Sequence, residues 1–438
     1  MQYPTISEYV KASQDAGDNL DMSTEATNAE LNEAITDEFG VKYSKDGRKL
    51  LKAPQKLDGT YTIRKGTKIV CDRAFADCKS LRSLVIPDGV TSIGDRAFSE
   101  CSSLTDIVLP DSVTSIGNDA FGRCKSLTSL VIPNSVTSIG DGAFYGCNSL
   151  SEIVIPSRVT SIGERAFCGC ESLSSFVIPD SVTSIGNHAF GRCKSLTSLV
   201  IPNSVTRIGD SAFLICTSLS SLVISDYVVN IKGNPFSGWD GELKCLSPYF
   251  IYDNKVLFNK DKSKIIAFRD KNSTSYVIPD YVTSIGNGAF YDCKSLKSLV
   301  IPDSVTSIGT WAFMGCSSLS SLVIPEGVTS IGDWAFRGCR SLSSLVIRAT
   351  GASIVDRAFK GCISLCCIAI HAKIVIPDGV TSIGDDALRG CTSLTDIVIP
   401  DSVTSIGDHA FAGCSFPYDL KQELSRLNQE KKTRQTFH

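Results

Sequence analysis

The chain has 438 residues, of which 43 are basic and 46 acidic, and its formal net charge is −3 at pH 7. Proteins that bind nucleic acids carry a concentrated basic face, so this balance argues against a nucleic-acid partner. No apolar run approaches the roughly 18 residues of a membrane-spanning helix, so we expect no membrane insertion.

Residues 1–40 form an acidic N-terminal segment with nine acidic residues and one basic residue. The segment has neither the basic start nor the apolar stretch of a secretory signal. We therefore expect a cytoplasmic protein, and a cell-surface or secreted location is the alternative. Helical spacing after Ser23 or Thr24 predicts a short helix that caps the rest of the chain, with an acidic docking tail as the alternative. The apolar stripe of this helix consists of Leu31, Ala34, Ile35 and Phe39.

The rest of the chain is built on a 23-residue unit, which residues 126–155 contain in full. The unit reads L-x-x-L-V-I-P-x-x-V-T-S-I-G-x-x-A-F-x-x-C-x-S. Its cysteine recurs in thirteen clear repeats, at Cys78, Cys101, Cys124, Cys147, Cys170, Cys193, Cys216, Cys293, Cys316, Cys339, Cys362, Cys391 and Cys414. One more, degenerate turn keeps the phase with Phe236 and Trp239. A single unit is too small to form a core, so the units must stack and share one.

A period of this length lies in the range of leucine-rich repeats, about 20–29 residues. We therefore predict a leucine-rich repeat solenoid, a curved stack of about fourteen turns. In each unit the L-V-I segment predicts a strand of a parallel β-sheet on the concave face, with Leu130 and Ile132 inward and Val131 outward. V-T-S-I-G predicts a second extended piece. D-x-A-F-x-x-C predicts one helical turn that Asp141 caps.

Two similar hairpins divide the chain. Alternating short strands around Lys45-Asp46-Gly47 predict a hairpin in residues 41–63, and residues 256–278 repeat the pattern 215 positions later. We expect one continuous solenoid with a bulged island, and two rigid arms hinged at the island are the alternative. The predicted parts are the acidic segment 1–40, the hairpin and first repeat block 41–238, the hairpin-bearing island 239–275, the second repeat block 276–414 and a C-terminal capping helix 415–438.

The residue types that carry catalysis or bind metals have no suitable spacing. The chain has 18 cysteines, but the repeat cysteines read as small buried hydrophobes, and no C-x-x-C pair supports a metal site. His188 precedes Cys193 by five residues, yet the same slot holds Arg, Asp, Gly or Ser in other repeats, so we interpret it as an exposed surface position. We predict no enzyme activity, no cofactor and no metal.

The A-F-x-x-C-x-S-L-x-x-[LI]-x-I-P-x-x-V-T-x-I-G unit, which fills residues 64–414, resembles the BspA-like class of bacterial leucine-rich repeats. The hairpin segments D-N-K-V-L-F-N-K-D and G-V-K-Y-S-K-D-G are similar to parts of the same family. The resemblance implies a curved solenoid that binds proteins or host surfaces, and many members are exported adhesins. The segment YPTISEYVKASQDAGDNLD is similar to the start of some bacterial modular proteins that carry a kinase-like domain.

Two surface features are candidate binding sites. The outward valine of the L-V-I strand recurs as an apolar column that includes Val300, Val323 and Val346. Trp311 and Trp334 occupy the His188 slot of adjacent repeats, so we expect them to lie side by side on the surface, where tryptophan is a common interface anchor. The alternatives are the strand propensity of valine and local packing of the tryptophans.

These observations predict a non-enzymatic protein-interaction scaffold that binds through the solenoid surface, and they leave its oligomeric state open. One alternative is a surface adhesin for host proteins or glycans. Another is a regulatory module related to kinase-like modular proteins.

Overall fold

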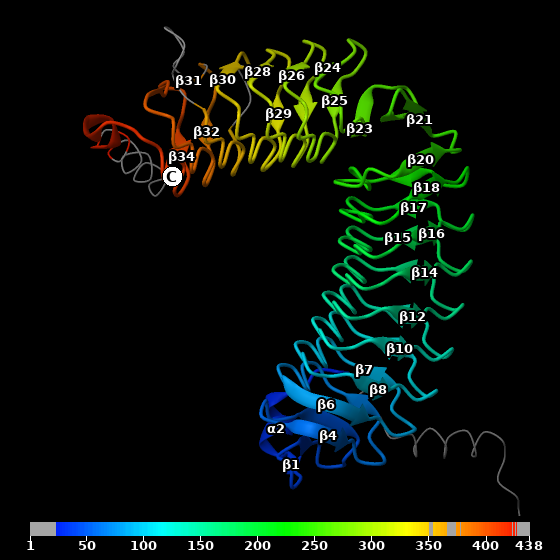
Figure 1. Ribbon diagram of the computed structural model, residues 1–438. Coiled ribbons are helices and arrows are strands. Elements are labelled where there is room, and N and C mark those ends of the chain that lie inside the picture. The colour runs from blue at the N-terminus through cyan, green and yellow to red at the C-terminus, as the bar shows by residue number, and fades with distance from the viewer. Residues whose placement is uncertain are drawn as a thin grey trace, which may run out of the picture.

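The computed structural model describes residues 23–349, 354–365, 374–376, 378–422, 424 and 426. These residues form a long stack of coils with a sharp bend near its middle (Figure 1). We name residues 23–245 the first arm and the described residues from 250 onward the second arm. The predicted fold class is confirmed, because the coils stack through short parallel strands that repeat every 23 residues.

Two strand ladders run along both arms. In the L-V-I ladder, Leu130 pairs in parallel with Ile153 of the next coil, and Val131 pairs with Val154. In most coils a proline comes shortly after the strand, as Pro133 does after Val131, and the strand ends there because proline has no N–H to donate. This ladder consists of β4 (Asp58–Thr62), β6 (Ser80–Val85), β8 (Asp106–Val108), β10 (Ser129–Val131), β12 (Glu152–Val154), β14 (Ser175–Val177), β16 (Ser198–Val200), β18 (Ser221–Ile224), β20 (Glu242–Cys245), β24 (Ser275–Val277), β26 (Ser298–Val300), β28 (Ser321–Ile324), β30 (Ser344–Ile347), β31 (Ile374–Val375) and β33 (Ile397–Val398).

The second ladder comes from the T-S-I-G segment, in which isoleucine points inward and serine outward. Ile139 pairs with Ile116 of the preceding coil. This S-I ladder consists of β5 (Ile69–Val70), β7 (Ser92–Ile93), β9 (Ser115–Ile116), β11 (Ser138–Ile139), β13 (Ser161–Ile162), β15 (Ser184–Ile185), β17 (Arg207–Ile208), β19 (Asn230–Ile231), β25 (Ser284–Ile285), β27 (Ser307–Ile308), β29 (Ser330–Ile331), β32 (Ser382–Ile383) and β34 (Ser405–Ile406).

The A-F-x-x-C segment is not the helical turn that the sequence predicted. The residue before A-F and the residue before the cysteine both have left-handed backbones, as at His188 (φ 54°) and Arg192 (φ 62°), and a right-handed helix excludes such residues. The turns instead bond to one another, with Phe121 N–H donating to the Ala143 carbonyl at 2.8 Å. Asp141 does not cap a helix; it accepts the N–H of Glu164 in the next coil at 2.7 Å.

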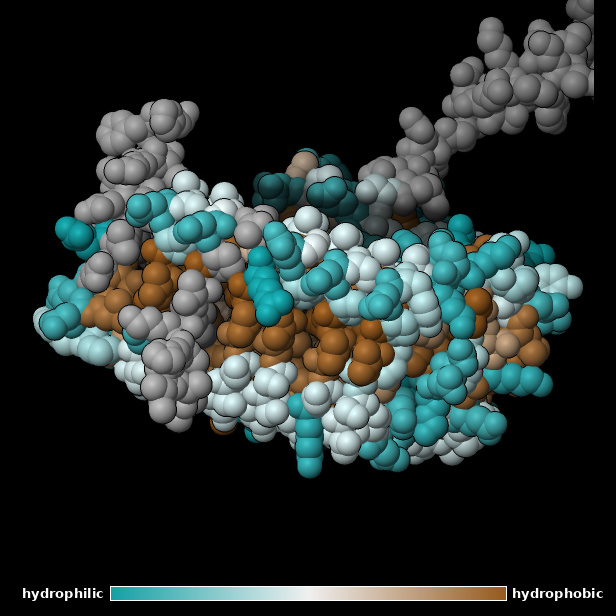
Figure 2. All heavy atoms as spheres, turned by 90° about the horizontal axis from the view of Figure 1, so that it is seen from above, coloured by the Kyte–Doolittle hydropathy of each residue, from teal (hydrophilic) through white to brown (hydrophobic). Residues whose placement is uncertain are grey.

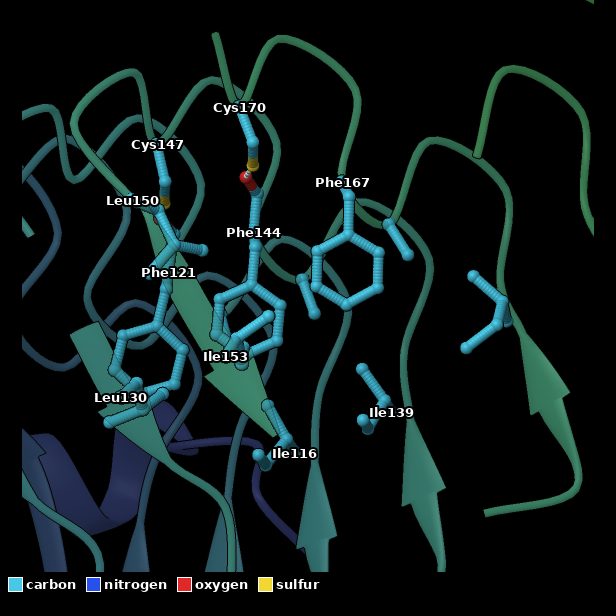
Figure 3. Close-up of a cluster of buried hydrophobic side chains, with 14 of the residues drawn as sticks. Ile116, Phe121, Leu130, Ile139, Phe144, Cys147, Leu150, Ile153, Phe167 and Cys170 are labelled. Carbon is cyan, nitrogen blue, oxygen red and sulfur yellow. Dashed lines mark hydrogen bonds between the residues drawn. The ribbon is translucent and has the colours of Figure 1, made fainter. Parts of the chain in front are cut away.

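The core of each arm is a stack of phenylalanines with a cysteine behind each ring (Figure 3). Phe144 stacks on Phe121 and Phe167 with ring centroids 5.5 and 5.4 Å apart. Cys170 Sγ donates to the Phe144 carbonyl at 3.2 Å, and Cys147 makes the same bond one coil earlier. Burial raises the pKa of Cys147 to about 12, so its thiol keeps the proton that it donates. The repeat cysteine is therefore a hydrogen-bond donor as well as a small buried side chain.

The position of the sheet differs from the prediction, because the L-V-I strands do not line the concave side. The A-F-x-x-C turns of both arms lie on the inner side of the bend (Figure 1), where His188 contacts Trp311 with ring centroids 6.0 Å apart. Figure 2, seen from above the second arm, shows an apolar band on the side away from this corner. In the described coils all three sides are hydrogen-bonded ladders. None of these coils has a long helix that would make one side wider and curve the stack toward the L-V-I strands.

Each arm begins with a three-stranded antiparallel hairpin unit, whose third strand pairs in parallel with an S-I strand. The first unit is β1 (Ile35–Thr36), β2 (Lys42–Tyr43) and β3 (Lys49–Lys52), and the second is β21 (Phe250–Asp253), β22 (Val256–Asn259) and β23 (Lys264–Phe268). The second hairpin separates two hydrophobic cores. Leu257 and Ile266 face the core of the first arm, whereas Phe258 and Ile265 face that of the second.

Buried polar contacts hold the two arms together. The guanidinium of Arg269 donates to the carbonyls of Trp239 and Gly241 at 2.9 and 2.6 Å, and it lies 4.2 Å from the centre of the Trp239 ring. On the inner side, Asn234 Nδ2 donates to the Gly288 carbonyl at 2.7 Å. The bend is therefore a packed joint within the solenoid.

The N-terminal helix is shorter than predicted. Helix α2 spans Asn28–Asn32, and Thr27 and Glu30 form a capping box at its start. The chain then turns into β1, so Ile35, which the sequence placed on the helical stripe, is exposed on a strand. Leu31 and Ala34 cover Leu51 on the outer face of the first hairpin. In the second hairpin the equivalent face, which carries Ile266, is covered by the core of the first arm.

At the other end, residues 418–422, 424 and 426 are helical. Leu424 is buried in the core of the second arm, and Leu420 packs beside it. The helix therefore covers the last coil, since the open end of a solenoid would otherwise expose its core. Residues 1–22 and 427–438, parts of the two predicted end segments, lie outside the described residues.

Replacing Cys170 with alanine tests the role of the repeat cysteine. The change leaves a void and removes the donor to the Phe144 carbonyl, so we expect the first arm to lose about 2 kcal/mol of unfolding free energy. Urea denaturation followed by circular dichroism measures the shift. Cys168→Ala is the matched control two residues away, because Cys168 is a buried free cysteine outside the Phe–Cys ladder of the described coils. Equal shifts for the two variants would contradict the donor role.

Replacing Arg269 with methionine tests the joint. Methionine fills similar space, but the carbonyls of Trp239 and Gly241 lose charged donors, a cost of about 3 kcal/mol. We expect scanning calorimetry to resolve two unfolding transitions, one for each core, where the parent protein has one. Arg158→Met, at an exposed arginine, should leave the trace unchanged. A single unchanged transition for Arg269→Met would show that the arms are coupled in another way.

Candidate functional site

The valine column is exposed along both arms. Val300, Val323 and Val346 lie on β26, β28 and β30, and their side chains are 50, 41 and 45 % exposed. The valines in the middle of the first arm are more exposed than these three: the five from Val108 to Val200 are 61–79 % exposed. The larger apolar surface is therefore on the first arm, although the sequence singled out valines of the second.

The tryptophans occupy a different face. Trp311 and Trp334 lie in the A-F-x-x-C turns on the inner side of the bend, where both line one cleft. Trp311 contacts His188 of the first arm. The ring of Trp334 lies 4.3 Å from the guanidinium of Arg337 and 4.9 Å from that of Arg357. The structure therefore places the tryptophans in one cleft but does not bring them together with the valines.

The cleft has a volume of about 610 Å³ and is bounded by both arms. The first arm contributes His188, Arg192 and Leu214. The second arm contributes Tyr291, Trp311, Met314, Trp334 and Arg337. A smaller hollow of about 390 Å³ continues along the second arm and shares Tyr291, Met314 and Arg337 with the cleft. Together they provide an elongated concave surface at the inner corner.

The cleft is cationic although the chain is acidic overall. Five cationic side chains line it, against the carboxylates of Glu100 and Glu171. Both carboxylates are already paired, Glu100 with Arg123 at 2.6 Å and Glu171 with Lys194 at 2.8 Å. Within the part of the chain that the structure describes, Arg192 and Arg337 have no carboxylate within salt-bridge distance. The cleft therefore presents cations that an anion can bind.

Burial shifts the pKa values of His188 and Tyr291, two ring side chains that line the cleft. Burial lowers the pKa of His188, and the nearby Arg165 lowers it further, so the imidazole is neutral at pH 7. Burial raises the pKa of Tyr291 and the carboxylate of Asp292 raises it further, while Arg192 and Arg337 act in the opposite direction. These two arginines come from different arms and approach the same phenol, so their charges converge there.

We call the residue before A-F in each coil the left-handed slot, because its backbone is left-handed. Side chains at this slot form part of the cleft wall. His188, Trp311 and Trp334 have φ values of 54, 58 and 60°, a conformation that glycine adopts at Gly142 and Gly288 in other coils. A bulky residue pays a backbone cost there, of the order of 1 kcal/mol. The slot projects side chains inward across the bend, and aromatic residues fill it in coils on both sides of the corner.

Sequence reasoning missed Arg192, Arg337, Tyr291 and Met314, and it treated His188 as a plain surface position. The available signal was the aromatic filling of the slot in repeats on both sides of residues 239–275. The contact between His188 and Trp311 depends on the bend, which residue spacing does not encode. Among the described residues no group of three or more histidine, cysteine or acidic side chains could hold a metal ion. None of the described helices is long and apolar enough to cross a membrane.

The sequence matches the family model described as BspA type leucine rich repeat region, over residues 59–159, 137–246, 264–374 and 367–430. A comparison with curated proteins gives no match. Among solved structures, the chain is similar to a leucine rich cell surface protein from Faecalibacterium prausnitzii A2-165. The two are 29 % identical over 87 % of this chain and 92 % of that one, with a TM-score of 0.53.

A leucine-rich repeat protein from Bacteroides ovatus ATCC 8483 is also 29 % identical, over 87 % of this chain and 91 % of that one, with a TM-score of 0.43. A leucine-rich repeat protein from Eubacterium ventriosum ATCC 27560 is 23 % identical over 88 % of this chain and 96 % of that one, with a TM-score of 0.50, which bears on the fold alone. The family match covers most of the chain and agrees with the repeat and the coil geometry. The chain therefore belongs to the family of BspA-type leucine-rich repeat proteins.

Proposed function

We propose that the chain is a non-enzymatic protein-interaction scaffold whose partner lies along the valine column of the first arm. The observation that carries this proposal is an unbroken row of exposed valines on seven consecutive coils. The row consists of Val85, Val108, Val131, Val154, Val177, Val200 and Val223. Soluble proteins rarely expose a contiguous apolar strip of this length unless something binds to it.

The row suits an extended partner better than a small ligand. Successive strands lie about 4.8 Å apart, so the valines form a nearly flat stripe without a pocket. Covering each of these side chains contributes about 1 kcal/mol, and a partner that crosses several coils adds these contributions. Strand propensity also selects valine at such positions, and lysine substitutions separate the two explanations.

The test uses three double-lysine variants of the chain as bait. Each variant captures proteins from lysates and membrane extracts, prepared from the cells that produce the chain and from host cells that those cells contact. Val131→Lys with Val177→Lys places charges in the row of the first arm, and we expect the captured partner to be lost. Val323→Lys with Val346→Lys, in the less exposed row of the second arm, should weaken capture less. Ser138→Lys with Ser161→Lys adds the same charges on the S-I ladder and should change nothing. Recovery of the same partners by all three pairs would refute the valine row as the binding surface.

A surface adhesin is the second candidate function. It is supported by the Faecalibacterium protein, which is similar over most of both chains and is named a cell surface protein. The expectation of a cytoplasmic location gains no support from the comparisons. The regulatory role alongside a kinase-like protein rests on the first residues of the chain, outside the described part, and stays a prediction.

Protease treatment of intact producing cells distinguishes the locations. If the chain is an adhesin, the protein disappears before lysis, because its solenoid is outside the envelope. A cytoplasmic enzyme measured in the same samples is the control and should survive. Protection of the chain until the cells are lysed would place it inside and would exclude adhesion.

A further inference from the structure

We propose that the cleft at the inner corner of the bend is a second binding site, one that takes a short acidic peptide segment with apolar side chains. This site is separate from the valine row, because the turns that form it lie on another side of the coils. Three features of the corner favour such a ligand: its rigid walls, the arginines Arg192 and Arg337, which are unpaired within the described residues, and the apolar side chains beside them.

The corner is formed before any ligand binds. Asn234 links the inner turns of the two arms through its bond to Gly288, and Arg269 links their cores behind it. His188 and Trp311 close the gap between the arms from opposite sides. A site whose walls are already fixed loses little conformational entropy when a ligand binds.

The charge of the cleft selects an anion. Arg192 and Arg337 stand on opposite walls near Tyr291, and each is free of carboxylates within the described residues. A guanidinium binds a carboxylate through two parallel hydrogen bonds, which gives direction as well as attraction. Two such groups on facing walls, with Lys125 further along the first arm, fit successive acidic side chains of one extended segment, whereas Arg165 is already paired with Glu164 at 3.2 Å.

The apolar groups of the cleft favour a peptide over a sugar or a base. Sugars and bases need an open aromatic face, but the ring of Trp334 is already covered by Arg337 and Arg357. Trp311 meets His188 edge to face, with ring planes 65° apart and centroids 6.0 Å apart, so its ring is held at the wall between the arms. The half-buried aliphatic side chains Leu214 and Met314 stand beside the arginines. A peptide in which an acidic residue is next to a leucine-like residue can pair its carboxylate with an arginine and pack its apolar side chain on Leu214 or Met314.

The size of the site sets the length of the segment. A volume of about 610 Å³ lies in the range of sites that enclose a small molecule. The smaller hollow beyond Met314 lets the segment continue along the second arm toward Arg340, past Lys294, which Asp292 already pairs at 2.9 Å. We therefore assign the site to about six residues of an extended chain.

Fluorescence anisotropy of the purified full chain with labelled peptides of about six residues tests this site. The probe alternates glutamate with leucine, and the comparison peptides alternate glutamine or lysine with leucine. We expect only the glutamate peptide to bind, and its affinity to fall between about 50 mM and about 500 mM salt. Binding of the glutamine peptide with equal affinity would overturn the proposal, because the arginines would then play no part.

Substitutions in the cleft test whether the peptide binds at the corner. Arg192→Gln and Arg337→Gln should each weaken binding about tenfold, because each removes a charged hydrogen-bond donor. Arg207→Gln, at an exposed arginine of β17, is the matched control and should bind like the parent. Trp311→Gly opens the wall without disturbing the backbone, since Gly288 adopts the same left-handed conformation one coil earlier, and it should also weaken binding.

Two outcomes would reject the site. Unchanged binding in the Arg192→Gln and Arg337→Gln variants would place the peptide elsewhere on the molecule. Binding of an acidic oligosaccharide in place of the peptide would show that the ligand class is wrong. Because the experiment uses a synthetic peptide and leaves the valines intact, its failure is distinguishable from failure of the proposed scaffold function.

Discussion

The contact between one phenylalanine and the next supports the whole molecule. A single coil buries too little apolar surface to fold by itself, so each depends on the rings above and below it. The cysteine thiol adds direction to this stacking, because its bond to a carbonyl 26 residues earlier fixes the rotation of one coil against the next. The aspartate ladder does the same at the edge of the turn, as Asp141 does for Glu164.

The bend interrupts this regularity without exposing the core. The second hairpin has apolar side chains on both faces, so it ends one core and begins the next. The first hairpin has the same design, and there Leu31 and Ala34 of the N-terminal segment cover the outer face. A repeated module thus takes a different cover in each place. Arg269 compensates the change of direction by donating to backbone carbonyls that the regular ladder leaves unused.

The two candidate surfaces follow from two different properties of the coil. The valine row arises because every L-V-I strand repeats the same outward residue in register, which suits many weak and similar contacts. The corner cleft arises because the left-handed slot accepts any side chain, so its residues vary from coil to coil. This slot supplied His188 and Trp311 where the arms face each other, and other variable positions of the same turns supplied Arg192 and Arg337. An extended partner on the row and an acidic segment in the corner can therefore bind without competing.

Residue spacing along the chain was enough to predict the repeat, the inward residues, the two hairpins and the exposed valines, because each of these depends on that spacing alone. The helical turn and the concave sheet were wrong for one reason. The left-handed residues beside A-F allow almost any side chain, so residue types did not reveal them, and they turn that side into a third ladder. The meeting of His188 with Trp311 was decided only by the tertiary structure, since it depends on packing at Trp239 and Arg269 that sets the direction of the second arm.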